Sequence, residues 1–124
     1  MEKNTRKIFV LGTEYQVFTK VKLEDDLCLK EKQLAGYCNS ISKTIVIGDA
    51  STFESCKYDS PSTRETYEKA TLRHEIVHAF MYESGLDSSA LTYDGPWATN
   101  EEMIDWFAAQ GPKIFSAWED ADAL

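Results

Sequence analysis

The segment from Ser62 to Ser84 constrains the fold most, because it contains neither glycine nor proline. Pro61 precedes it and Gly85 follows it, and these residue types are typical of the first turn and the end of a helix. Ser62 and Glu65 fit a capping box, which favours a helix start at Ser62. An apolar row at helical spacing predicts one buried face, made of Leu72, Ile76 and Phe80 with Val77 and Met81 beside them.

The only two histidines of the chain lie in the middle of this expected helix, in the sequence His74-Glu75-Ile76-Val77-His78. Residues four apart share one face of a helix, so both imidazoles can reach the same metal ion. Glu75 lies beside them, where its carboxylate can accept a proton from a water molecule on that metal. The spacing is typical of catalytic zinc, and we expect Zn²⁺ with His74 and His78 as ligands and Glu75 as the catalytic base.

Catalytic zinc usually takes three protein ligands, and with no other histidine the third is expected from a second helix, Asn100–Gln110. Thr99 and Glu102 fit a capping box, which occupies Glu102 and leaves Glu101 to bind the metal. Asp105, one turn after Glu101, can then accept a hydrogen bond from the distal nitrogen of a ligand histidine. Glu101 is the favoured third ligand, with Glu102 and Asp105 as the alternatives.

The N-terminal half is expected to form β-strands. Lys7–Leu11 and Tyr15–Val21, separated by Gly12-Thr13-Glu14, predict a hairpin. Thr44–Gly48 has the strongest strand pattern of the chain, and Leu23–Leu34 fits either a short helix or a loop.

Helices are expected in the C-terminal half. Gly111-Pro112 should break the helix that carries the acidic residues, and Lys113–Ala121 should form a last helix. The aromatic side chains of this region are expected in the core: Trp106, Phe107, Phe115 and Trp118. With 124 residues the chain fits a single domain, residues 1–124, of the α+β class, in which an antiparallel sheet precedes the helices.

Composition excludes several classes of function. A net charge of −8 and a pI near 4.7 disfavour a nucleic-acid partner. No apolar run is long enough for a membrane span, and the N-terminus does not read as a signal peptide. Cys28, Cys38 and Cys56 are odd in number and lack paired spacing, which predicts reduced thiols and a cytoplasmic location.

These motifs resemble those of the gluzincins, zinc peptidases in which a carboxylate helix follows the HExxH helix. Within that group the chain resembles the small ImmA/IrrE-like peptidases of phages, mobile elements and Gram-positive bacteria. Their carboxylate helix is paralleled here by Glu101-Glu102-Met103-Ile104-Asp105-Trp106-Phe107-Ala108, with Ile104 in place of a small residue. The resemblance covers roughly residues 44–110, where Thr44–Gly48 corresponds to an edge strand.

The resemblance implies a minimal zincin-like fold and zinc-dependent hydrolysis of a peptide or protein substrate. The strand Thr44–Gly48 is expected to bind an extended substrate by edge pairing. A second donor to the reacting carbonyl is expected from Tyr93, with Tyr82 and Arg73 as alternatives. The alternative function is a zincin-like zinc-binding protein without peptidase activity, which acts by binding a partner protein.

Overall fold

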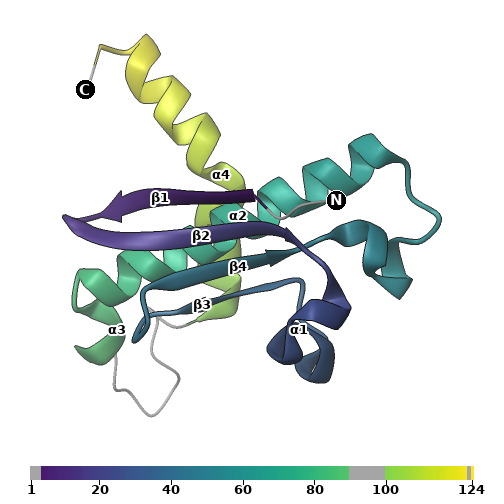
Figure 1. The fold of residues 1–124 in the computed structure, drawn as a ribbon. Helices are drawn as coiled ribbons and strands as arrows, with labels where there is room; N and C mark the ends of the chain where they lie inside the picture. The colour runs from purple at the N-terminus through teal and green to yellow at the C-terminus, as the bar shows by residue number, and fades with distance from the viewer. Residues whose placement is uncertain (1–3, 90–99, 123) are drawn as a thin grey trace.

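The computed structural model describes residues 4–89, 100–122 and 124, and its centre is a four-stranded mixed sheet (Figure 1). The strands are β1 (Asn4–Val10), β2 (Thr13–Val21), β3 (Gly36–Asn39) and β4 (Thr44–Gly48), in the order β1-β2-β4-β3. β1 with β2 and β3 with β4 are antiparallel, whereas β2 and β4 are parallel. The α+β class is as predicted, although the sheet is mixed and not antiparallel throughout.

The predicted hairpin and the predicted strand Thr44–Gly48 are both confirmed. The hairpin turn consists of Leu11 and Gly12, which both have positive φ (49° and 85°), as a tight two-residue turn requires. The expectation that Thr44–Gly48 lies at the sheet edge is wrong, because β4 pairs on both sides. The edge strand is β3, which the sequence analysis did not predict.

The long helix is α2 (Pro61–Glu83), which lies across one face of the sheet (Figure 1). Its cap is Ser60 and not Ser62, because Pro61 takes the first helical position and Ser60 Oγ accepts from Thr63 N at 3.2 Å. Gly85 ends the helix as predicted, with φ +86°. The core side of α2 consists of Leu72, Ile76 and Ala79, packed on a cluster that includes Val10, Tyr15, Val17, Ile45 and Ile47.

The predicted apolar row of α2 is correct in its first half only. Leu72 and Ile76 pack on the core, but Phe80 is 42% exposed, and Ala79 is buried in its place. The reason is that the helix turns by about 100° per residue, so a strict i, i+4, i+8 row drifts away from the sheet over two turns.

The opposite face of the sheet is covered by α1 (Leu27–Lys32), whose Leu29 is fully buried against Val21 and Val46. The segment Leu23–Leu34 is therefore mainly helical, with a 3-10 turn at η1 (Leu23–Asp25). Asp26 caps α1 by accepting from Leu29 N at 3.0 Å. Further short helices are η2 (Ala50–Thr52), η3 (Glu54–Cys56) and α3 (Leu86–Ser89).

The last helix is α4 (Glu101–Asp120). The N-terminal part of α4 packs on α2, and the C-terminal half of α4 extends away from the sheet (Figure 1). The predicted break at Gly111-Pro112 is wrong. Pro112 lacks the N–H that would bond to the Ala108 carbonyl oxygen. Arg73 Nε donates to that oxygen at 3.1 Å, so the helix continues without an orphaned acceptor.

The aromatic side chains expected in the core lie mostly at the surface. Trp106, Phe107 and Phe115 are 55%, 40% and 51% exposed, and the side chain of Trp118 lies outside the described residues. Among the described side chains of α4, the buried ones are Ile104 and Ala108, which are four apart and face α2. Among the described residues no helix combines the length and the apolar character needed to cross a bilayer.

Candidate metal centre

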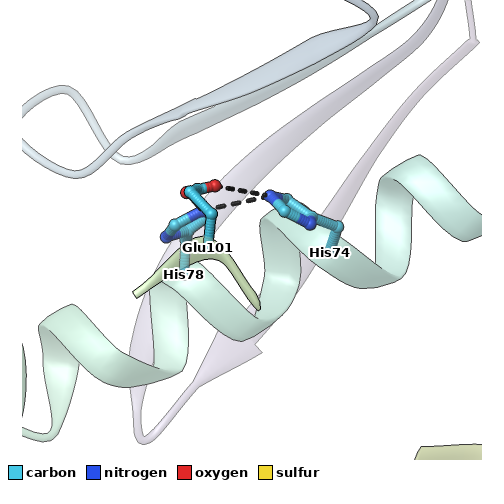
Figure 2. Close-up of side chains that lie close together, drawn as sticks. All are labelled: His74, His78 and Glu101. Atoms are coloured by element: carbon cyan, nitrogen blue, oxygen red, sulfur yellow. Dashed lines mark hydrogen bonds and ion pairs between the residues drawn. The ribbon is translucent and has the colours of Figure 1, made fainter. Parts of the chain in front are cut away.

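Two residues of α2 and the first residue of α4 bring their polar atoms together (Figure 2). His74 Nε2 and His78 Nε2 are 3.2 Å apart. Glu101 Oε1 lies 2.8 Å from His78 Nε2, and Glu101 Oε2 lies 3.4 Å from His74 Nε2. This group of His74, His78 and Glu101 can hold a metal ion.

The spacing of the two histidine nitrogens fits a small tetrahedral cation. Zinc binds imidazole nitrogen and carboxylate oxygen at roughly 2.0–2.2 Å, which places neighbouring tetrahedral ligand atoms about 3.3 Å apart. The 3.2 Å between the two histidine Nε2 atoms is close to that value. The distances of 2.8 Å from His78 Nε2 and 3.4 Å from His74 Nε2 are to two different oxygens of the Glu101 carboxylate. Nitrogen lone pairs and a carboxylate that converge in this way repel one another unless a proton or a cation lies between them. The donor set therefore fits a divalent metal.

Asp105 determines which nitrogen of His74 faces this group. The His74 Nδ1–H donates to Asp105 Oδ1 at 2.5 Å, which leaves the Nε2 lone pair directed at Glu101 and His78. A carboxylate in this position fixes the tautomer of a ligand histidine and raises its basicity. The hydrogen bond predicted for Asp105 is thus present, from the residue one turn after Glu101.

Glu75 is the buried acid of the site. It is only 8% exposed, and its Oε2 lies 3.9 Å from His74 Nε2. Burial raises the pKa of Glu75 to about 7; the proximity of His74 opposes the shift, and the negative charges of Glu101 and Asp105 add to it. A carboxyl group with a pKa near neutrality, beside the ligand atoms, is suited to accept and return a proton.

Glu101, the favoured third ligand, is the carboxylate that lies with the two histidines, but the capping argument behind that choice is wrong. The cap of α4 is Asn100, whose Oδ1 accepts from Met103 N at 3.0 Å. Thr99 lies outside the described residues. Glu102 is not part of the ligand group and lines a separate surface hollow with Met103 and Trp106. Glu101 points toward the histidines because of its position around the axis of α4, and not because Glu102 is occupied as a cap.

A cavity of about 360 Å³ opens beside the ligand group and is lined by all three of its residues and by Glu75. Three residues were expected to donate a hydrogen bond to the reacting carbonyl group. Tyr82 lines this cavity, the Arg73 side chain is hydrogen-bonded to the Ala108 carbonyl oxygen, and Tyr93 lies outside the described residues. The cavity also contains Cys38, a free thiol whose pKa is raised to about 12, chiefly by burial.

The opposite wall of the cavity is the edge strand β3. The Gly48 N–H donates to the Ala35 carbonyl oxygen at 2.9 Å. Ala35 and Gly48 are therefore a hydrogen-bonded pair of the antiparallel ladder between β3 and β4. Hydrogen-bonded and non-hydrogen-bonded pairs alternate along an antiparallel ladder, so the N–H and C=O groups of Gly36 and Cys38 point away from β4. Both residues line the cavity. Sequence reasoning missed this strand; the usable signal was Asn39, whose Oδ1 accepts from the backbone of the β3–β4 turn.

Comparison with known proteins returned no significant match to a family model, a curated protein or a solved structure. The geometry of the site therefore carries the functional argument.

Proposed function

We propose that this protein is a zinc-dependent peptidase whose metal is held by His74, His78 and Glu101. The observation that carries the proposal is the convergence of the two histidine nitrogens and the Glu101 carboxylate beside the buried carboxyl group of Glu75. Two histidines and one glutamate are a ligand set of catalytic zinc, which keeps its fourth position open. A structural zinc site would instead be closed by four ligands, mostly cysteine and histidine.

The chain's own residues account for the proton transfers of hydrolysis. Zinc held by these three residues would lower the pKa of a bound water molecule and would polarise a carbonyl group. Glu75 accepts the proton of the attacking water and returns it to the leaving amine, because its carboxyl group lies beside the ligand atoms. Asp105 keeps His74 in the tautomer that presents Nε2. Tyr82, in the same cavity, is the described residue best suited to donate to the carbonyl oxygen.

The substrate is proposed to be an extended peptide. The outward N–H and C=O groups of Gly36 and Cys38 offer a short ladder to a further strand, next to the ligand residues. Pairing at a sheet edge holds a peptide through its backbone and leaves its side chains to occupy neighbouring hollows. The strand proposed to pair with the substrate is therefore β3 and not Thr44–Gly48, which lies inside the sheet.

Metal binding is tested by elemental analysis of purified protein after loading with zinc and desalting. We expect one zinc per chain in the wild type and loss of zinc in His78→Ala and Glu101→Ala. Glu102→Ala is the matched control, since Glu102 is adjacent in sequence and is not in the ligand group. A wild type that binds no zinc would end the proposal, and loss of zinc in Glu102→Ala alone would assign the third ligand to that residue.

Hydrolysis is tested with a mixed peptide library cut by the zinc-loaded wild type and by Glu75→Gln. We expect cleavage by the wild type and a loss of at least about a hundredfold in Glu75→Gln, with zinc content unchanged. Equal background turnover in the two proteins would favour the alternative, a zinc-binding protein that acts through a partner.

A further inference from the structure

One face of α2 forms the floor of a groove that is longer than the metal site. Its residues recur at helical spacing along α2 from Tyr67 onward: Tyr67, Thr71, His74, His78 and Tyr82. The wall is formed by the chain from Leu34 through β3 to Ser40. Cavities of about 360, 290 and 670 Å³ lie along this groove.

These cavities adjoin one another, because neighbouring ones share lining residues. Gly36, His74 and Glu75 line both the metal cavity and the middle one. Ala35 and Tyr67 line both the middle cavity and the largest, which we term the distal cavity. A peptide that pairs with β3 at the metal site therefore continues into the distal cavity when it extends past Ala35.

The distal cavity has apolar walls fixed in the core. Apolar side chains supply most of its lining: Leu23, Leu34, Ala35, Phe53 and Tyr67. Phe53 is only 9% exposed and belongs to a buried cluster, against which Ala35 packs. Tyr67 meets Phe53 edge to face at 6.5 Å and remains 43% exposed, so part of its ring is available to a ligand.

The polar rim of this cavity does not favour a charged side chain of a bound peptide. Lys30 and Glu54 lie on it with opposite charges, and Glu54 Oε1 is paired with Lys57 Nζ at 2.9 Å. A large apolar side chain gains most here, because it removes apolar surface of both partners from water.

The distance from the metal ligands sets the position of that side chain. Tyr67 and His74 are two helical turns apart, which corresponds to about 10 Å along α2. An extended peptide advances about 3.3 Å per residue. We propose that the distal cavity is a specificity site for a large apolar side chain of the substrate, about three residues from the bond that is cut. This inference rests on the proposed function, since it assumes the peptide substrate proposed there.

The test uses zinc-loaded Glu75→Gln, which keeps the groove, to select binders from a displayed library of random peptides. Ser55→Trp is added to fill the distal cavity, because Ser55 is an exposed residue on its rim. Glu65→Trp is the matched control, since Glu65 is exposed on α2 and lines none of the three cavities. We expect selected peptides to share a large apolar residue, and serine at that position to weaken binding about tenfold or more.

Ser55→Trp should abolish this preference, whereas Glu65→Trp should retain it. Selected peptides without a shared apolar residue, the same preference in both variants, or no selected peptide at all would each overturn the specificity site. The selected peptides are then offered to the zinc-loaded wild type. Cleavage about three residues from the apolar position supports both proposals; binding without cleavage keeps the specificity site and refutes only the hydrolysis.

Discussion

Arg73 donates its Nε–H to the carbonyl oxygen of Ala108 at 3.1 Å, and this bond joins the helix of the histidines to the helix of Glu101. The carbonyl is available because Pro112, four residues later in α4, has no N–H to offer it. Ala108 is 7% exposed, so water has little access to the oxygen if Arg73 is removed. The side chain that precedes His74 thus compensates for a proline in a neighbouring helix.

This relationship predicts a coupling between two distant positions. Arg73→Met should lower the free energy of unfolding by about 1–3 kcal/mol, because it leaves a buried carbonyl without a donor. In a Pro112→Ala background the loss should be smaller by about 1 kcal/mol or more, because alanine supplies the missing helical N–H. Urea unfolding of the two single variants and the double variant measures the coupling. Lys69→Met, an exposed change on the same helix, is the control, and additive effects of the two substitutions would contradict the prediction.

Asp105→Asn should weaken zinc binding by roughly 10- to 100-fold, because the amide no longer fixes the His74 tautomer with a full negative charge. Competition with a chromogenic chelator measures the affinity. Glu102→Gln removes the same charge from the same helix turn and should change the affinity little. An Asp105→Asn protein that binds zinc as tightly as the wild type would show that this hydrogen bond does not tune the site.

Glu75 predicts a pH dependence of stability in protein stripped of metal with EDTA. Its pKa rises from 4.5 to about 7 on folding, so between these values the folded chain binds more protons than the unfolded chain. Stability is therefore lost as pH rises, by up to about 3 kcal/mol. Glu75→Gln should match the wild type near pH 4 and exceed it at pH 8, as measured by urea unfolding. Glu65→Gln, at an exposed site, should follow the wild type at both pH values.

Gly36→Ala should destabilise the protein by about 1–3 kcal/mol, because the new methyl group overpacks a closed space. A Cβ at this position would lie 2.9 Å from both Thr71 Cγ2 and the Val46 carbonyl oxygen. Gly111→Ala is the control: a Cβ there meets nothing within 4 Å, and alanine should stabilise the interior of α4 by about 0.5–1 kcal/mol. Thermal or urea unfolding gives both values, and equal effects of the two changes would refute the close packing of β3 on α2.

Local patterns predicted much of this structure. The α2 helix, the β1–β2 hairpin and β4 each carry their own signals, namely uninterrupted helical residues, turn residues and a β-branched run. The pairing of His74 with His78 also follows from spacing, because histidines four apart on a helix share a face. The choice of Glu101 over Glu102 does not, since it was drawn from a cap that the structure assigns to Asn100.

Two of the errors concern relations between distant segments. The parallel pairing of β2 with β4 puts β4 inside the sheet, and neither strand's own sequence encodes its neighbour. The break assigned to Pro112 ignored a donor, Arg73, that lies 39 positions earlier and reaches the helix only in the folded chain. β3 was missed because a strand of 4 residues that includes a glycine carries little pattern of its own.

A metal ion bound by Glu101, His74 and His78 would hold two helices together. The side chain of Glu101 is 63% exposed, and Glu101 is the only member of the ligand group that α4 contributes. A metal that joins Glu101 to His74 and His78 adds its binding free energy to the docking of α4 on α2. At a free metal concentration of 100 times the dissociation constant, this linkage amounts to about 2.7 kcal/mol. With such a metal bound, the attachment of α4 to α2 would depend on the supply of metal as well as on the sequence.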